Sequence, residues 1–418
     1  MKMLPFLAAL VCASPAFAAP QFSTLYSFGR AKDNPSILPE AGLTAAPDGS
    51  FYGTTTSDGK VKHAYGTVFK LSPPGTPGTQ WTLQTIYTFR GGAEAGEPVA
   101  RMIFDQDTGA LLGTASAQEG GGDLGSVFRL VPPANDGDPW SLQIIHTFTG
   151  GDDGIYPRPG LVQDPATGAV YGATTAPPGS PVTLYGFAPD ASHQNWTRNL
   201  SFVFSGAEDG ADPGSDLALS GDGVLYGTTV TGGTANDGLI YSYDLASSSF
   251  AVLFQSSGSP QPERFSSGTP LLEGSEMIAT SSRGPEQHCK NVLECGTVFT
   301  MPLDGSAAPA VLASLTGANS GPIEAGVVWN AAHTALYGTA KYGLPNRCNY
   351  FGVPKTGCGS VFEITQKRGR WKLSILHAFD GTDGSGPNQL VFGSDGALYG
   401  TTETGGVNHT GTIFRIAP

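Results

Sequence analysis

A short motif, Leu-Tyr-Gly-Thr-Thr, recurs seven times along the chain and constrains the fold more than any other feature of the sequence. We take the Tyr position of the motif as a marker. It falls at Tyr52, Tyr171, Tyr226, Tyr337 and Tyr399 in five copies, and at Leu112 and Ile278 in two degenerate copies. Successive markers are 52 to 62 residues apart. Because the units of a regular repeat share one continuous core, we expect a single domain despite the length of 418 residues.

Each unit contains further segments typical of β-strands. A strand before the marker ends in a turn such as Asp48-Gly49, Asp222-Gly223 or Asp395-Gly396, and Asp-Gly tolerates the positive φ of a tight hairpin turn. A strand related to Gly-Thr-Val-Phe follows the marker, as at 66–69, 125–128, 296–299, 359–362 and 411–414.

The fourth strand of the unit begins at a Trp and ends at a Phe eight positions later. Four units have this pair: Trp81 and Phe89, Trp140 and Phe148, Trp196 and Phe204, Trp371 and Phe379. Since side chains alternate along a strand, the even spacing predicts that both rings lie on one face.

Four strands per unit, with no sustained helical period after the N-terminus, predict an all-β fold: a seven-bladed β-propeller of four-stranded blades. The coils of a parallel β-helix are shorter than these units, and an open array is the other alternative. Residues 24–28 form a fourth strand before the first marker, whereas the last unit stops after its third strand at Ile416. We therefore expect the N- and C-terminal strands to complete one blade together.

Residues 1–18 have the pattern of a secretory signal peptide. Lys2 precedes a short apolar segment, and Ala16-Phe17-Ala18 provides a cleavage site after Ala18. A lipoprotein signal at Cys12 is the alternative, disfavoured by the bulky Val11. No later segment approaches the ~20 apolar residues of a membrane span. Residues 19–418 are thus expected to form one propeller domain that is secreted or periplasmic.

The chain is acidic, with 35 Asp and Glu against 22 Lys and Arg and a formal net charge of −13. The negative net charge argues against a nucleic-acid partner, because nucleic-acid binding depends on basic surfaces.

The Tyr-Gly-Thr-Thr, Gly-Thr-Val-Phe and Asp-Gly elements resemble those of the GloVer tandem-repeat family, also called choice-of-anchor repeats, over residues 22–417. The resemblance implies an exported bacterial protein with a β-propeller-like fold, and it implies no particular activity. Members have varied C-terminal anchors, and the chain departs from the family in that we expect none here.

In a propeller, the loops between the second and third strands share a face with the connections between blades. From marker to third strand these loops span 11 to 14 residues in five blades, but 18 in blade 5 and 22 in blade 6. Because loops vary while the scaffold holds them, insertions gathered on one face predict a binding face.

Four cysteines lie in these two long loops. Cys295 and Cys358 occupy equivalent repeat positions, and we expect disulfides to Cys289 and Cys348 within each loop, since export favours oxidation. Each short loop closed in this way is worth roughly 2.5 kcal/mol. Pairing between the two blades is an alternative, and zinc binding is a weaker one because the spacings do not match usual zinc motifs.

Candidate ligand-binding residues lie on the same predicted face. Aromatic rings beside cationic side chains suit a sugar site in the blade-6 loop, although a disulfide-pinned loop covering the rim is the favoured explanation of them. Histidines on this face could act as bases, but none has a carboxylate partner at a recognisable spacing. These candidates are Tyr342, Arg347, Tyr350, Lys355, His63, Tyr65, His288 and His409.

Acidic connections between blades are candidates for Ca²⁺, the one cofactor suggested by the sequence, through carboxylates such as Asp152, Asp153, Asp209 and Asp383. The alternative is that these residues fill turns for conformational reasons, since no EF-hand pattern is present.

Motifs of the common hydrolases, metalloproteases and nucleotide-binding enzymes are absent. The favoured function is therefore a secreted binding module for a polysaccharide or cell-surface component. A polysaccharide lyase, with a Tyr or His base and with Arg or Ca²⁺ neutralising a uronate, is the enzymatic alternative. A purely structural role in assembly is the third.

Overall fold

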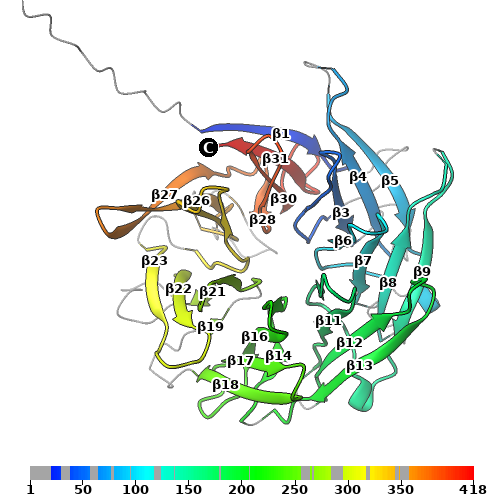
Figure 1. Ribbon diagram of the computed structural model, residues 1–418. Helices are drawn as coiled ribbons and strands as arrows, with labels where there is room; N and C mark the ends of the chain where they lie inside the picture. Colours follow the sequence, from blue (N-terminus) through cyan, green and yellow to red (C-terminus); the bar gives the residue numbers. More distant parts are fainter. Residues whose placement is uncertain are drawn as a thin grey trace, which may run out of the picture.

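The computed structural model describes residues 20–29, 38–56, 65–76, 80–94, 96–116, 124–135, 137–177, 180–206, 208–255, 264–265, 268–283, 295–316, 321–343, 348 and 357–418. Seven antiparallel sheets surround a central axis, each with its shortest strand innermost (Figure 1). The prediction of an all-β, seven-bladed β-propeller is confirmed.

Blades 1 to 3 consist, from inside to outside, of four strands each. In blade 1 these are β2 (Thr44–Ala45), β3 (Phe51–Thr55), β4 (Thr67–Ser72) and β5 (Thr82–Thr88). In blade 2 they are β6 (Ile103–Phe104), β7 (Leu111–Ala115), β8 (Ser126–Val131) and β9 (Ser141–Thr147). In blade 3 they are β10 (Val162–Gln163), β11 (Val170–Ala173), β12 (Thr183–Pro189) and β13 (Trp196–Val203). Two 3-10 turns, η1 (Gly92–Glu94) and η2 (Gly151–Asp153), connect these blades.

The innermost strand is divided in blades 4, 5 and 7. Blade 4 has β14 (Ala211–Pro213), β15 (Ala218–Leu219), β16 (Val224–Thr231), β17 (Leu239–Asp244) and β18 (Ser249–Gln255). Blade 5 has β19 (Arg264–Phe265), β20 (Leu271–Glu273), β21 (Glu276–Arg283), β22 (Thr297–Pro302) and β23 (Ala310–Ser314). Blade 6 has β24 (Val328–Trp329), β25 (Ala335–Ala340), β26 (Ser360–Lys367) and β27 (Arg370–Ala378). Blade 7 has β28 (Ser385–Pro387), β29 (Val391–Phe392), β30 (Leu398–Thr404), β31 (Thr412–Ala417) and, from the N-terminal end, β1 (Gln21–Ser27).

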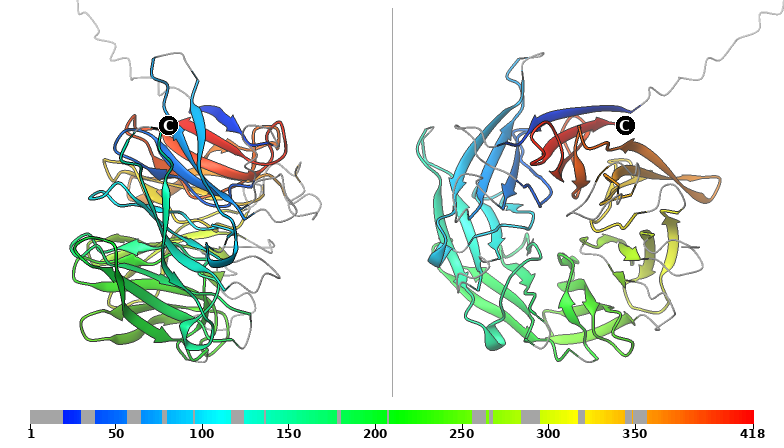
Figure 2. Two further views of the ribbon diagram at one scale, coloured as in Figure 1. Left: turned by 90° about the vertical axis from the view of Figure 1, so that its right-hand side faces the viewer. Right: turned by 180° about the vertical axis from the view of Figure 1, so that it is seen from behind.

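The ring is closed by pairing between the two ends of the chain. Strand β1 runs antiparallel along the outside of β31, from Gln21 opposite Ala417 to Ser27 opposite Thr412. Figure 2 shows the same closure from behind the ring. The prediction that both terminal strands complete the last blade is confirmed, and no outer edge of β31 is left open there.

The marker motif is explained by contacts at the middle of each blade. A Cβ atom at Gly53 would overlap the Phe69 ring of the neighbouring strand, so the tight approach of β3 and β4 requires glycine. The second Thr of the motif bonds the Thr of the following strand, as between Thr55 Oγ1 and Thr67 Oγ1 at 2.7 Å.

The first Thr of the motif links neighbouring blades around the axis. Thr401 Oγ1 of blade 7 donates to Ala41 O of blade 1 at 2.7 Å, across the closure. Equivalent bonds join Thr280 to Ala325 O and Thr339 to Asn388 O. The repeat thus carries the residues that hold one blade to the next.

The prediction that the Trp and Phe of the fourth strand share a face is wrong. A β-bulge interrupts the pairing of the third and fourth strands. In blade 1 the register shifts between Val68 and Phe69 of β4, where β5 has one extra residue. The extra residue reverses which face the rest of the strand presents. Consequently Trp81 packs in the core between blades 7 and 1, whereas Phe89 packs in the core between blades 1 and 2.

The described residues form seven hydrophobic core clusters, one between each pair of adjacent blades. The cluster at the closure joins Phe51 of blade 1 to Tyr399 of blade 7, whose ring centroids are 4.3 Å apart. Burial therefore stabilises the closure in the same way as the other interfaces.

Loops between second and third strands contact the connections between blades, as predicted. Glu97 N donates to Tyr65 O, and Ser116 N donates to Glu97 O. We call this side of the ring the loop-bearing face. Within the described ranges, no helix has the length and apolar character to span a membrane.

Candidate binding site on the propeller axis

A cavity of about 330 Å³ lies on the axis, and residues from all seven blades line it. The cavity is lined by the chain segments that lead from the loop-bearing face into the innermost strands. It is also lined by the residues four positions after the marker in blades 3, 6 and 7. The charged and amide side chains among them are Glu40, Arg101, Arg158, Asp212, Asp216, Glu324, Lys341, Asn388, Gln389 and Glu403.

Lys341 and Glu403 form a buried ion pair in this wall. They come from blades 6 and 7, are 7% and 8% exposed, and make a direct contact between the Lys341 ammonium and the Glu403 carboxylate. Both occupy the fourth position after the marker, where the other blades have Thr56, Ser116, Thr175, Val230 and Ser282. The two charges therefore replace small uncharged residues of the repeat.

Asn388 extends this ion pair toward blade 1. Its amide oxygen accepts a 2.7 Å bond from Lys341 Nζ, while its amide nitrogen donates to Pro39 O at 2.8 Å and Thr401 Oγ1 at 2.9 Å. Because Asn388 is buried and its oxygen and nitrogen are both bonded, it fixes the position of the Lys341 ammonium.

Glu40 faces the same part of the cavity from blade 1. Its burial, and secondarily repulsion from the Glu403 carboxylate, raise its pKa above the usual value for glutamate. Lys341, a hydrogen bond from Thr56 and the nearby Arg158 oppose this shift. Acidic and basic groups of blades 1, 3, 6 and 7 thus interact across the axis.

Asp216 ties three blades together on the other side of the cavity. Its carboxylate accepts bonds from Gly160 N at 2.5 Å and Thr269 Oγ1 at 3.0 Å. By contrast, neither the partly buried Arg101 nor the exposed Arg158 forms an ion pair within 4.0 Å with a described carboxylate. Their donor groups are available to a ligand in the cavity.

The family model described as the Gloeobacter/Verrucomicrobia repeat matches residues 39–293 and 277–418. The chain belongs to this repeat family. The match confirms the resemblance inferred from the motifs. No curated protein matches the sequence significantly.

Two solved structures are similar to this Gloeobacter/Verrucomicrobia repeat protein. One is a Bacteroides uniformis protein assigned provisionally as a 6-phosphogluconolactonase, with 14% identity, a TM-score of 0.47, and coverage of 81% of this chain and 84% of its own. The other is the Penicillium chrysogenum alpha-L-arabinanase complexed with arabinobiose, with 14% identity, a TM-score of 0.43, and coverage of 76% and 92%. At these values neither similarity bears on the function of the repeat protein.

None of the described ligand-binding candidates from the sequence lines the axial cavity. Tyr65 packs against Gly91 and Gly96 in the connection between blades 1 and 2, and Tyr342 follows Lys341 at the start of the blade-6 loop. His409 is exposed in the turn before β31. The other candidates lie outside the described residues: Arg347, Tyr350, Lys355, His63 and His288.

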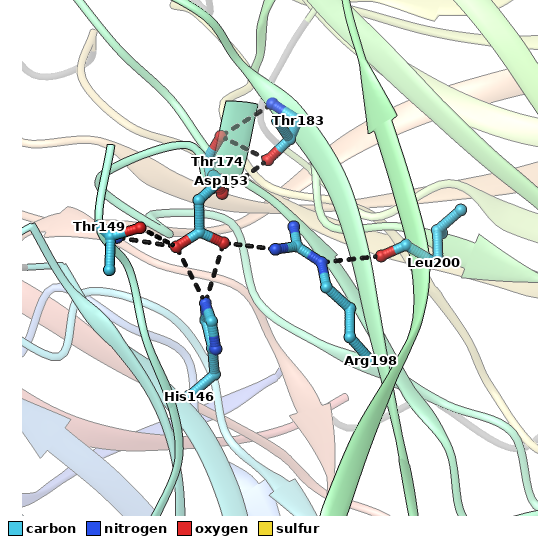
Figure 3. A network of polar contacts seen from close by, with 7 residues as sticks. All are labelled: His146, Thr149, Asp153, Thr174, Thr183, Arg198 and Leu200. Carbon is cyan, nitrogen blue, oxygen red and sulfur yellow. Dashed lines mark hydrogen bonds and ion pairs between the residues drawn. The ribbon is translucent and has the colours of Figure 1, made fainter. Parts of the chain in front are cut away.

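The aspartates considered for Ca²⁺ lie in three separate connections between blades, one of which holds both Asp152 and Asp153. Figure 3 shows Asp153 bonded by the Thr149 backbone N–H at 2.7 Å, by Arg198, and by His146 Nε2 at 2.9 Å. Asp209 bonds Ser205 N at 2.8 Å.

Asp383 in the equivalent turn lies 2.7 Å from His377 Nε2 and accepts from Asp380 N at 3.0 Å. Asp152 is exposed. The part of the chain that the structure describes holds no group of three or more His, Cys, Asp or Glu side chains able to bind a metal. The carboxylates of Asp153, Asp209 and Asp383 each accept a backbone N–H bond within their own turn, so these residues cap the turns.

The disulfide between Cys348 and Cys358 is confirmed, with Cα atoms 5.0 Å apart. Cys295 is also disulfide-bonded, and its expected partner Cys289 lies outside the described residues. The sequence-based candidates do not include the axial residues, because the long loops are the more conspicuous departure from the repeat. A signal was present in the sequence, since Lys341 and Glu403 break a position otherwise occupied by Thr, Ser or Val.

Proposed function

We propose that this repeat propeller is a binding module for neutral carbohydrate, and that a sugar residue occupies the axial cavity. The observation that carries the proposal is the lining itself, in which guanidinium, ammonium and amide groups share one cavity with five carboxylates, contributed by six of the seven blades.

Such a lining suits hydroxyl groups. Each hydroxyl donates one hydrogen bond and accepts others, so it can pair with a carboxylate and a guanidinium at the same time. Bonds that involve a charged group are about twice as strong as bonds between neutral groups. A volume near 330 Å³ is at the lower end of the range for small-ligand sites, as expected for a site that takes a sugar residue or two.

The charge of the cavity favours a neutral ligand over an acidic one. Its described lining contains five carboxylates, at Glu40, Asp212, Asp216, Glu324 and Glu403, against three cations, at Arg101, Arg158 and Lys341, a formal charge of 3 − 5 = −2. A uronate would be repelled by this excess.

The lyase alternative receives less support for the same reason, and because no Tyr or His is found among the described lining residues to act as its base. The Cys348–Cys358 disulfide is in keeping with an oxidising compartment outside the cytoplasm, where an envelope or extracellular glycan would be met.

The test is titration calorimetry of the folded protein with a panel of neutral oligosaccharides, chosen by a glycan-array screen. Arg158→Ala and Arg101→Ala should each weaken binding about tenfold or more, since a bond to a charged donor is worth about 1.5–3 kcal/mol. Arg370→Ala is the matched control, because Arg370 is exposed in the β26–β27 hairpin away from the cavity. Absence of binding across the panel, or equal loss in all three variants, contradicts the proposal.

A further inference from the structure

A second hollow of about 670 Å³ lies on the loop-bearing face between blades 3 and 4. We call it the groove. Its described lining comes from residues 176–177 and 180–182 between β11 and β12, from residues 203–206 and 211–212 at the end of β13 and the start of β14, and from Thr231 and Asn236 of blade 4. The residues that matter below are Pro177, Pro181, Val203, Gly206 and Asp212.

At the groove, the residue before the third strand does not cover the glycine of the connection that follows. In blades 1 and 2, Tyr65 and Leu124 precede the third strand, and their side chains lie against Gly91 and Gly150 of the connection that follows. Blade 3 has Pro181 at this position, and nothing lies within 4 Å of a Cβ built on the equivalent Gly206.

The equivalent glycine of blade 6, Gly381, is also covered by a side chain from the preceding loop. A Cβ on Gly381 would lie 3.0 Å from Cys348 Sγ, so the disulfide covers that connection. The uncovered Gly206 of blade 3 is therefore a local departure from the repeat. Lys341 and Glu403 at the axis are two further departures.

Asp212 joins the groove to the axial cavity, because it lines both. Its positive φ of 54° is matched by those of Leu38, Glu97 and Tyr156, which also precede a proline in the equivalent connections, so this left-handed conformation belongs to the repeat. The two hollows are thus neighbours on either side of Asp212, within reach of one extended ligand.

The groove and the axial cavity differ in chemistry. Apart from Asp212 the groove has no charged side chain in its described lining, and it presents proline rings and Val203, which is 37% exposed, beside the hydroxyls of Ser180 and Ser205. Proline and valine surfaces pack against the C–H face of a sugar ring, while hydroxyls at the edge bond its substituents.

We propose that the groove is a second subsite, which binds the sugar residues that follow the one held at the axis. This inference rests on the proposed function and adds the direction and the minimum length of the ligand. The protein should therefore discriminate by chain length, preferring oligosaccharides of about three or more units to the monosaccharide.

The experiment measures affinity for one neutral series of one to six units, taken from the best array hit, by titration calorimetry. Pro181→Tyr restores the residue type that covers the connection in blade 1, and Val203→Glu places a charge on an exposed groove position. Val407→Tyr adds a ring to the same face of blade 7, where Val407 is 80% exposed, and is the control.

The wild type and Val407→Tyr should bind the trimer at least about tenfold more tightly than the monomer, equivalent to 1.4 kcal/mol. Pro181→Tyr and Val203→Glu should reduce this gain to less than about threefold while leaving the affinity for the monomer unchanged. Arg158→Ala should weaken binding at every length.

Affinity independent of length in the wild type, or a length gain that persists in both groove variants, would overturn the inference and leave the axial site standing. Self-association that Pro181→Tyr abolishes, with sugar binding unchanged, assigns the groove to a second copy of the chain and likewise overturns it. Failure of the wild type to bind any member of the array overturns the proposed function itself.

Discussion

Lys341 and Glu403 stand 62 residues apart in the sequence and form a buried ion pair at the axis, at the same position of two consecutive repeats. The Lys341 ammonium also reaches Asn388, which bonds the backbone of Pro39 in blade 1. One charge pair thereby links blades 6, 7 and 1, the three blades around the closure of the ring.

Lys341→Thr should destabilise the protein strongly. It removes the cation and leaves the Glu403 carboxylate buried, which costs about 3–5 kcal/mol. The double variant Lys341→Thr/Glu403→Thr restores the residue type of the other blades and should lie within about 1 kcal/mol of the wild type. Denaturant unfolding measures both, and equal losses in the single and double variants contradict the prediction.

Asp153→Asn should lower stability by roughly 2 kcal/mol at neutral pH, because the carboxylate accepts several bonds from charged and backbone donors. Burial alone would raise the pKa of Asp153, but the Thr149 N–H, His146 and Arg198 outweigh it and hold the pKa below its usual value. The unfolded chain then binds a proton more readily than the folded one.

The stability due to Asp153 is therefore present above about pH 4 and is lost as the pH falls through the lower folded-state pKa. The difference between the wild type and Asp153→Asn should shrink as unfolding is measured from pH 6 toward pH 2. The exposed Asp152→Asn is the control and should change stability by less than about 0.5 kcal/mol. A difference that is constant with pH would refute the linkage.

Replacement of Cys348 and Cys358 by serine should cost about 2.5 kcal/mol, since the disulfide closes a loop with a sequence separation of 10. The Gly381 connection would also lose the cover of Cys348. Thermal unfolding of the variant and the wild type under non-reducing conditions measures the difference. A variant with wild-type stability would show that packing alone holds this loop.

Arg368→Asn should stabilise the β26–β27 hairpin by about 0.5–1 kcal/mol. Arg368 and Gly369 form the two-residue turn between the paired Lys367 and Arg370, and both have positive φ, 53° and 76°. Asparagine tolerates this conformation better than arginine. Arg370→Asn changes the neighbouring strand residue and should give no gain, so equal effects of the two substitutions would rule out the backbone explanation.

Much of the fold could be predicted because the repeat is a local pattern. The number of blades followed from turn residues such as Asp395-Gly396 and from the spacing of the markers. The closure of the ring followed from the incomplete units at the two ends. The faces of Trp81 and Phe89 could not be predicted by counting, because a β-bulge adds a residue without a distinctive sequence. The ion pair between Asp153 and Arg198 could not be predicted either, because only the fold brings these two residues together.

The sequence by itself determined seven repeated units of alternating strands and the pairing of the first strand with the last unit. Only the tertiary structure decided that Arg101, Arg158, Asp216, Lys341 and Glu403 line one axial cavity and that a second hollow shares Asp212 with it. The physical reason is that strand alternation and turn chemistry act over a few residues. The curvature of the closed ring, by contrast, brings together side chains that are tens to hundreds of residues apart.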